Sequence, residues 1–263
     1  LKKRVSIMRV IAVANQKGGV GKTTTSVNLA ASFAANKRRV LLIDLDPQGN
    51  ATTGSGVNKH DTEHTLYDVL LNHVPISQAK VEAEESGYSL LASNDDLTAA
   101  EIDLIDASMR DKRLKMALEL VVKDYDYVVI DCPPSLSMLT INGLVASHGV
   151  LVPIQCEYYA LEGLSSLVKT IERISQKLNP DLVIEGLVRT MYDARNNLAT
   201  EVSSQIIKHF PDQVMNTIIP RNIRLAEAPS HGVPVLMYDK ACRGSLAYRA
   251  LASEIQRKRE KNK

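Results

Sequence analysis

The chain has 263 residues, of which 44% are hydrophobic and 24% are charged, a balance typical of a soluble globular protein with a real core. Its formal net charge is only +2, so any affinity for nucleic acid must come from a local basic patch. The three cysteines are widely spaced and form no CxxC pair, so their spacing indicates neither a disulfide framework nor a zinc site. No apolar stretch approaches the ~18 residues of a membrane span, and no signal-peptide pattern begins the chain. We therefore expect a cytoplasmic protein with no membrane contact.

Apolar segments alternate with helical patterns along the whole chain. Continuous apolar strands that alternate with helices predict an α/β fold, with a mostly parallel twisted sheet covered by helices on both faces. The expected strands are residues 10–14, 40–43, 89–92, 127–130, 150–154, 183–187 and 214–218. The expected helices are residues 23–36, 65–72, 97–108, 112–123, 161–178, 198–209 and 244–257.

The sequence contains no internal repeat, low-complexity tract or convincing linker. We therefore expect a single domain over residues 9–255. A short N-terminal extension over residues 1–8 precedes it, and a basic polar tail over residues 256–263 follows it. The simple interpretation of that tail is a frayed terminus.

A glycine-rich loop lies between the first expected strand and the first expected helix. Backbone N–H groups in such a loop, together with the helix N-terminus, face an anion and form a phosphate cradle. Lys22 would reach the terminal phosphates, and the Thr23 hydroxyl would ligate Mg²⁺. The standard loop has glycine where this chain has Gln16, and a second lysine, Lys17, comes next. The residues expected to bind the nucleotide here are Lys17, Gly18, Gly19, Val20, Gly21, Lys22, Thr23 and Thr24.

Acidic residues follow two of the expected strands. Asp44 and Asp46 come at the carboxyl end of the strand at residues 40–43, where an open sheet places its ligand. A carboxylate there could hold Mg²⁺ through water or orient an attacking water, but a strand-ending Asp can also simply cap a loop. Asp131 ends the strand at residues 127–130 in the Walker B pattern, which places it near the metal. Together with the loop, these acids predict nucleotide binding.

These motifs resemble the ParA/MinD group of deviant-Walker ATPases, and specifically the chromosomal ParA (Soj) type. The phosphate loop with its extra lysine is shared by the whole group, whereas four further stretches indicate the ParA type: residues 44–50, 131–135, 155–163 and 219–232. The resemblance extends from residue 9 to about residue 255. It implies a P-loop NTPase fold of the deviant Walker A type that uses ATP and Mg²⁺.

The resemblance further implies an ATPase that works as a dimerisation switch. Lys17 would cross to the partner subunit of a homodimer and offset the charge of its nucleotide phosphates, although a solvated loop lysine is the alternative. Asp46 would position the hydrolytic water, while Asp44 and Asp131 would support the metal together with Thr23. Catalysis would therefore depend on Lys17, Lys22 and Asp46, with slow basal turnover that a partner accelerates.

Pro220 and Asn222 match the adenine-contacting segment of the family. The amide of Asn222 can both donate to and accept from the edge of adenine. The alternative is that these residues only form a turn before a helix.

The resemblance implies that the ATP-bound dimer binds double-stranded DNA without sequence preference. Arg195 and Arg224 match the family's DNA-contacting positions, and arginines on phosphates give salt-dependent, sequence-blind affinity. Five further basic residues could extend the patch, although a solvated surface charge is the usual interpretation of each: Lys208, Arg221, Lys240, Arg243 and Arg249. A ParB-type centromere-binding partner would stimulate hydrolysis, and the protein would be nucleoid-associated in chromosome or plasmid segregation.

Two other classes of function are weighed against this one. A membrane-surface regulator of the MinD kind needs an amphipathic C-terminal helix, and the polar residues 256–263 offer no apolar face. A nucleotide-binding carrier of metal clusters needs cluster cysteines, which the spacing in this chain does not match.

Overall fold

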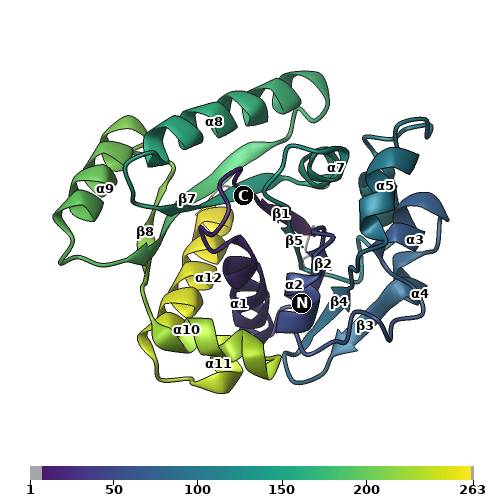
Figure 1. Cartoon of the computed structure of the whole chain (residues 1–263), viewed down its shortest axis with the longest axis horizontal. Helices are drawn as coiled ribbons and strands as arrows, with labels where there is room; N and C mark the ends of the chain where they lie inside the picture. The colour runs from purple at the N-terminus through teal and green to yellow at the C-terminus, as the bar shows by residue number, and fades with distance from the viewer. Residues whose placement is uncertain (1–7, 262–263) are drawn as a thin grey trace.

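An eight-stranded sheet runs through the computed structural model, which describes residues 8–261 (Figure 1). The strand order is β3-β4-β2-β5-β1-β6-β7-β8, and every neighbouring pair is parallel except β3 with β4. The strands are β1 Arg9–Val13, β2 Val40–Asp44, β3 Lys80–Ala83, β4 Tyr88–Leu91, β5 Tyr127–Asp131, β6 Gly149–Gln155, β7 Val183–Tyr192 and β8 Val214–Pro220. The expected fold class is confirmed.

Helices cover both faces of this sheet. The longer ones are α1 Lys22–Ala35, α5 Leu97–Asp103, α6 Arg113–Glu119, α7 Met138–Ala146, α8 Ala160–Lys177, α9 Asn197–His209 and α12 Arg243–Lys261. Shorter ones are α2 Asn50–Gly54, α3 Leu66–Leu71, α4 Ile76–Ala79, α10 Ile223–Glu227, the 3₁₀ turn Ala228–His231 and α11 Val235–Tyr238. Figure 1 shows α7, α8 and α9 on one side of the sheet, and α1 and α12 on the other.

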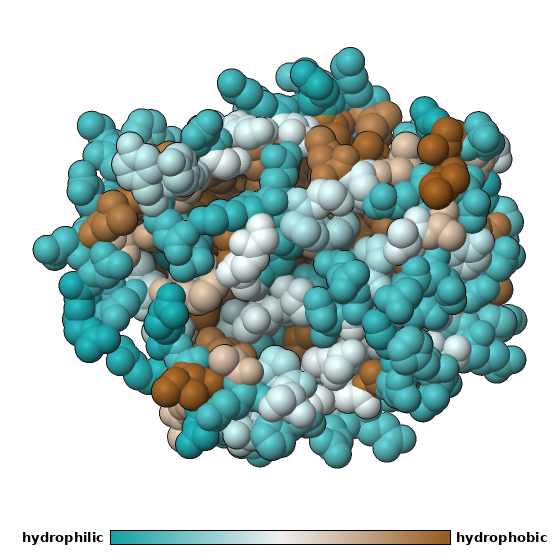
Figure 2. All heavy atoms as spheres, in the orientation of Figure 1, coloured by the Kyte–Doolittle hydropathy of each residue, from teal (hydrophilic) through white to brown (hydrophobic). Residues whose placement is uncertain are grey.

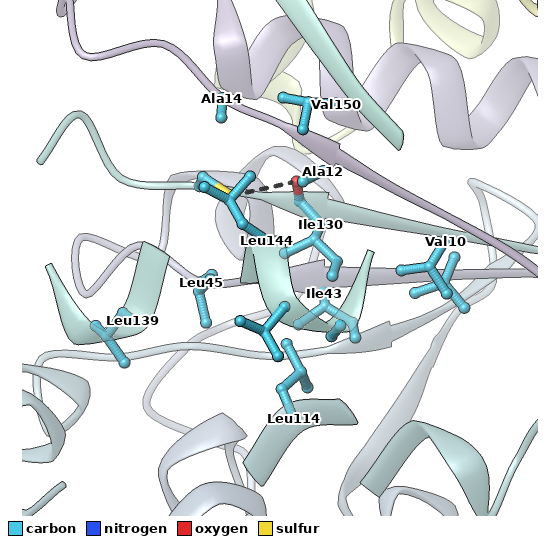
Figure 3. Packing of buried hydrophobic residues seen from close by; sticks show 14 of the residues in the cluster. Val10, Ala12, Ala14, Ile43, Leu45, Leu114, Ile130, Leu139, Leu144 and Val150 are labelled. Carbon is cyan, nitrogen blue, oxygen red and sulfur yellow. Dashed lines mark hydrogen bonds between the residues drawn. The ribbon is translucent and has the colours of Figure 1, made fainter. Parts of the chain in front are cut away.

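Side chains of each central strand alternate between two hydrophobic cores. In β1, Val10 and Ala12 join the core beneath α6, α7 and α8, while Ile11 and Val13 join the core beneath α1 and α12. Figure 3 shows the first core, where Ile43 and Ile130 from adjacent strands lie among side chains of α6 and α7. Because both faces of the central strands are buried, β2, β5 and β6 are almost continuously apolar, and this pattern is what predicted a parallel sheet from the sequence.

The elements that sequence patterns did not predict are short or wholly buried. α7 was absent from the predictions because seven of the nine residues of its segment MLTINGLVA are buried, so apolar and polar positions show no helical period. The antiparallel edge strand β3 has only four residues. The predicted helices at residues 97–108 and 112–123 were too long, since α5 and α6 have seven residues each.

The polar C-terminal segment is ordered into α12 through Lys261, so the interpretation as a frayed end was wrong for residues 256–261. The Gln256 side chain accepts a hydrogen bond from Asn36 at 3.1 Å. The Arg259 guanidinium lies 5.1 Å from the ring centre of Tyr127. These contacts hold the last turns of the helix against the domain.

α12 also protects the edge strand β8. The buried carboxylate of Glu254 accepts the backbone N–H groups of Asn216 at 2.8 Å and Thr217 at 2.9 Å. An edge strand whose donors are satisfied in this way is not open to pairing with another strand. The contact also fixes β8, whose end carries Pro220.

Candidate nucleotide-binding site

The glycine-rich loop lies between β1 and α1 and leaves an open cradle. Gly19 and Gly21 have φ values of 72° and 85°, in the left-handed region that glycine adopts without steric cost. A Cβ added to Gly18 or Gly19 would meet no heavy atom within 4 Å. The outer side of the loop is therefore free for an anion, with the N-terminus of α1 behind it.

Lys22 occupies the floor of this cradle. Lys22 as a whole residue is 7% exposed, and its Nζ donates to the carbonyl oxygen of Lys17 at 3.2 Å. Burial lowers the pKa of the Lys22 ammonium, while the nearby carboxylates of Asp131 and Asp46 act in the opposite direction. A buried ammonium with one neutral acceptor is ready to bind an anionic group.

Asp131 lies at the end of β5, directly opposite Asp44 of β2 in the parallel register. It is fully buried and accepts the hydroxyl of Thr23 at 2.7 Å and that of Ser26 at 2.7 Å. Burial raises the pKa of Asp131, and the charge of Asp44 adds to this shift. The sheet thus brings Thr23 and the two carboxylates together, as the sequence predicted for a metal site.

Asp44 is held with equal rigidity by the segment that follows it. Its Oδ2 accepts both the N–H and the hydroxyl of Thr52 at 2.8 Å, and its Oδ1 accepts the N–H of Asp46 at 3.2 Å. Burial raises the pKa of Asp44 against the effect of these hydrogen bonds. Thr52 lies eight residues after Asp44 in the chain. The hydrogen bond between them therefore closes the intervening loop over the Asp44 carboxylate.

Asp46 is half-buried at the start of that loop. Its Oδ1 accepts the N–H of Gln48 at 3.0 Å, and its carbonyl accepts the hydroxyl of Ser93 at 2.8 Å. Gly49 has φ 66°, and a Cβ there would lie 2.8 Å from the Ser93 carbonyl oxygen, so the turn requires glycine. The charge of this carboxylate raises the pKa of Lys22, so Asp46 lies close to the same cradle.

The donor set fits a hard cation beside phosphates. The Thr23 hydroxyl and the carboxylates of Asp44 and Asp131 are oxygen ligands of the kind Mg²⁺ prefers, with water and phosphate completing its shell. Within residues 8–261, no three His, Cys, Asp or Glu side chains gather into a preformed metal centre. The metal would therefore depend on the nucleotide for part of its coordination.

Lys17 lies at the exposed rim of the cradle. Its Nζ is 2.6 Å from Oε2 of Glu157, and the two side chains are 41% and 47% exposed. Its backbone N–H donates to Asn15, whose own amide donates to the Pro153 carbonyl at 2.8 Å. The lysine is thus anchored by its backbone while its charge faces outward.

Pro220 is the last residue of β8 and lies opposite Tyr192 in the sheet register, and Asn222 follows as the N-cap residue of α10. The Oδ1 of Asn222 is buried, and no donor within residues 8–260 reaches it. A buried acceptor without a partner is costly unless a ligand or water satisfies it. This observation fits the expected contact with a base.

The two predicted DNA-contacting arginines follow neighbouring strands: Arg195 lies on the loop after β7, and Arg224 lies in α10, after β8. The side chain of Arg195 is 90% exposed and forms two hydrogen bonds with Asp193, at 3.0 and 2.8 Å, which lower the pKa of that carboxyl to about 2. The side chain of Arg224 is 50% exposed and lies 2.8 Å from Glu227. The structure therefore separates both arginines from the phosphate cradle and presents them to solvent.

Several residues that complete the site were not predicted. Ser26 follows Thr23 by three positions in α1, and this spacing places both hydroxyls on the helix face toward Asp131. Thr190 donates to the carbonyl of Val20 at 2.8 Å and ties β7 to the loop. Three further residues contact the site from positions distant in sequence, which no local pattern predicts. Asn15 donates to Pro153, Thr52 donates to Asp44, and Glu157 pairs with Lys17.

No helix within residues 8–261 is long and apolar enough to cross a membrane.

Residues 8–184 match the AAA_31 family, described as an AAA domain. The Bacillus subtilis sporulation initiation inhibitor protein Soj is 51% identical over 247 residues, which cover 94% of this chain and 98% of the relative. The Caulobacter vibrioides chromosome partitioning protein ParA is 51% identical over 250 residues, 94% of each chain.

The structure of cobyrinic acid a,c-diamide synthase from Mycobacterium smegmatis with bound ATP analog and magnesium superposes with a TM-score of 0.86. It is 38% identical and covers 98% of each chain. The names of these relatives differ, but the identity to the Soj and ParA relatives is 51%, against 38% to the mycobacterial protein. The chain belongs to the AAA_31 family, among the ATPases of the ParA/Soj chromosome-partitioning type.

Proposed function

We propose that this protein binds ATP with Mg²⁺, pairs with a second copy of itself through the bound nucleotide, and in that form binds DNA without sequence preference. The observation that carries this proposal is the convergence of an open glycine cradle, buried Lys22, and the Thr23–Asp131–Asp44 cluster at one edge of the sheet. The mycobacterial relative with bound ATP analog and magnesium supports the choice of ligand.

The residues of the cradle have distinct tasks in hydrolysis. The loop N–H groups and Lys22 hold the phosphates, and the Thr23 oxygen supplies a ligand for Mg²⁺, which when bound neutralises charge on the phosphates. Asp44 and Asp131 fix the metal and its waters because their own hydrogen bonds lock their orientation. Asp46 accepts from and orients the attacking water. Pro220 and Asn222 contact the adenine, and the unpartnered Asn222 Oδ1 accepts from its amino group.

Lys17 connects nucleotide binding to pairing of two chains. Its ammonium is exposed at the rim of its own cradle, where an exposed ion pair with Glu157 is worth about 0–1 kcal/mol and is easily exchanged. In the dimer it crosses to the partner's phosphates, which are a more highly charged acceptor. Pairing then depends on the terminal phosphate and ends after hydrolysis.

Arg195 and Arg224 give the dimer its DNA-binding surface. Doubling the set of arginines makes a weak monomer site useful, since the contacts of two copies act on one duplex. The isolated protein hydrolyses ATP slowly, and a ParB-type centromere-binding protein accelerates this turnover. The cellular consequence is a nucleoid-associated cytoplasmic protein that drives chromosome or plasmid segregation.

A gel-shift experiment on several unrelated duplexes, with ATP or ADP and Mg²⁺, tests this proposal. We expect retardation of all duplexes with ATP, little with ADP, and loss of retardation in Arg195→Glu and Arg224→Glu. Liposome flotation with ATP serves as the comparison for a membrane regulator. ATP-dependent flotation without any DNA retardation would replace the proposal by that alternative.

A further inference from the structure

Two glycines that are far apart in the sequence, Gly56 and Gly232, touch through their backbones. Both lie in the left-handed region, with φ values of 82° and 66°. A Cβ added to Gly56 would lie 2.7 Å from the carbonyl oxygen of Gly232, and a Cβ added to Gly232 would lie 2.9 Å from the Cα of Gly56. Any other residue at either position would therefore be strained and would push the two segments apart.

The segment of Gly56 leads to the two acids of the first loop. The N–H of Gly56 donates to a carbonyl of the last turn of α2 at 3.0 Å. In that helix, Thr52 donates both its N–H and its hydroxyl to Asp44. α2 begins directly after Gly49, whose N–H donates to the Asp46 carbonyl at 2.9 Å. A displacement of Gly56 would therefore move the helix that holds both acids in place.

The segment of Gly232 leads to the residue that is expected at the base. Asn222 is the N-cap of α10, the 3₁₀ turn follows α10 without a gap, and Gly232 ends that turn. Within the segment, the Ser230 hydroxyl donates to the Glu227 carbonyl at 2.7 Å, and the Tyr238 hydroxyl donates to the Glu227 carboxylate at 3.3 Å. These contacts make a short rigid body with Asn222 at one end and Gly232 at the other.

Beside the glycine contact, the two segments face each other across a cavity of about 300 Å³. Thr53 and Gly54 of α2 line one side of it, Ala228 and Pro229 of the 3₁₀ turn line another, and the start of α1 contributes as well. Packing next to the contact is therefore incomplete, in contrast to the dense core beneath the sheet. The position of α2 relative to the 3₁₀ turn consequently depends on the two glycines.

We propose that Gly56 and Gly232 are positioning residues that make hydrolysis, and not only binding, depend on the base of the nucleotide. The inference rests on the proposed ATP hydrolysis and adenine contact, and it deepens them. Adenine on Asn222 fixes α10 and the 3₁₀ turn, Gly232 then fixes α2, and α2 holds the acids that orient the metal waters and the attacking water. Without the base contact, the phosphates still bind but the acids are held less firmly, and a misplacement of about 1 Å near reacting groups can cost about 100-fold in rate.

Single-turnover hydrolysis of ATP and of purine riboside triphosphate, which lacks only the amino group of adenine, tests this coupling. The protein is used in excess with Mg²⁺, at concentrations that bind all of the nucleotide. We expect the unmodified protein to hydrolyse the analogue about tenfold more slowly than ATP. In Gly232→Ala the ratio of the two rates should fall to about one, because the link is broken for both nucleotides. A purely structural role of this glycine would slow both reactions equally and leave the ratio unchanged.

Gly87→Ala is the matched control. Gly87 also has a positive φ, of 75°, but a Cβ there would approach no atom closer than 3.9 Å. The substitution thus carries the backbone strain without the clash, and the tenfold ratio should persist. Equal rates for the two nucleotides in the unmodified protein, a persistent ratio in Gly232→Ala, or loss of the ratio in Gly87→Ala would each overturn the inference.

Hydrogen exchange over residues 50–57 gives a second test that needs no glycine variant. In Asp46→Ala, used to prevent hydrolysis, amides of α2 and the following turn should exchange severalfold more slowly with ATP than with the analogue. Equal exchange with both nucleotides would also overturn the inference. If the unmodified protein hydrolyses neither nucleotide, the proposed function itself fails, which is distinct from equal hydrolysis of both.

Discussion

The carboxyl edge of the sheet holds two regions of opposite character. Beside the phosphate loop, Asp131 and Asp44 are fully buried, and neighbouring hydroxyl and backbone groups donate to their oxygens at 2.7–3.2 Å. At the rim, Lys17, Arg195 and Arg224 are exposed, and each pairs with an acid of its own surface. One region is fixed before any ligand binds, whereas the other must exchange its partners to act.

The energies of the two kinds of contact explain this division. A hydrogen bond to a charged group contributes about 1.5–3 kcal/mol, whereas an exposed ion pair is worth about 0–1 kcal/mol. The buried cluster can therefore hold catalytic geometry, and the rim can release its cations to another molecule. Figure 2 shows a mostly hydrophilic face with separate apolar groups, so contacts on this face depend largely on polar and charged side chains.

The largest effect is expected from Lys22→Ala in the buried region. Without its ammonium, the cradle loses its main charge toward phosphates, and ATP affinity should fall at least about 100-fold. Isothermal titration with ATP and Mg²⁺ measures this. Lys169→Ala, which removes an exposed lysine of α8, is the control and should bind normally. Normal ATP affinity in Lys22→Ala would contradict the location of the phosphate site.

Asp46→Ala should reduce turnover by about 100-fold while leaving ATP binding and pairing intact. The side chain orients water and makes no contact that the fold requires beyond the Gln48 N–H. Phosphate release measures turnover, and sedimentation measures pairing. We expect the variant to stay dimeric and bound to DNA with ATP. Turnover at the normal rate would remove Asp46 from this role.

Lys17→Ala tests the rim and should weaken pairing about tenfold or more, with nucleotide affinity of the single chain largely retained. Glu157→Gln is the matched variant, because it frees Lys17 without removing it. It should leave pairing equal or slightly stronger. Persistent ATP-dependent pairing in Lys17→Ala would show that the lysine does not cross between subunits.

The smallest effect concerns stability without nucleotide. Burial raises the pKa of Asp131 and Asp44, so between the ordinary Asp range and these raised values the folded chain binds more protons than the unfolded chain. Its free energy of unfolding should therefore fall as pH rises through that window. Asp131→Asn should reduce this fall and raise the free energy of unfolding at pH 8 by about 1–3 kcal/mol. Denaturation at pH 5 and pH 8 measures it, with exposed Asp212→Asn as control. If the free energy of unfolding of Asp131→Asn depended on pH as it does in the unmodified protein, the raised pKa of the buried Asp131 carboxylate would be contradicted.

The buried region was the more predictable of the two from sequence. A phosphate loop and strand-ending acids are local patterns, and parallel strands necessarily place Asp44 and Asp131 at the same edge. Their supporting groups were not predictable in the same way. Thr52 and Thr190 reach the site through tertiary contacts, and only the spacing of Thr23 and Ser26 carried a local signal.

The rim depended on resemblance, because an exposed arginine has no pattern that separates it from a solvated charge. The resemblance predicted Arg195 and Arg224 as DNA contacts. It did not show that acidic residues of their own segments form ion pairs with them. Nor did it place Arg221 and Arg243 in one cavity with Arg195. Such placement requires the ends of β7 and β8 and the start of α12 to meet.

Sedimentation of the protein with ATP, with ADP and without nucleotide, in the presence of Mg²⁺ and a labelled duplex, tests the central claim most directly. Of the three nucleotide conditions, we predict that only ATP gives a protein species of twice the 28.9 kDa chain mass. We also predict that the protein comigrates with the duplex only when ATP is present. A single chain at saturating ATP that still carries DNA as well as it does with ADP would contradict the coupling of nucleotide, pairing and DNA binding.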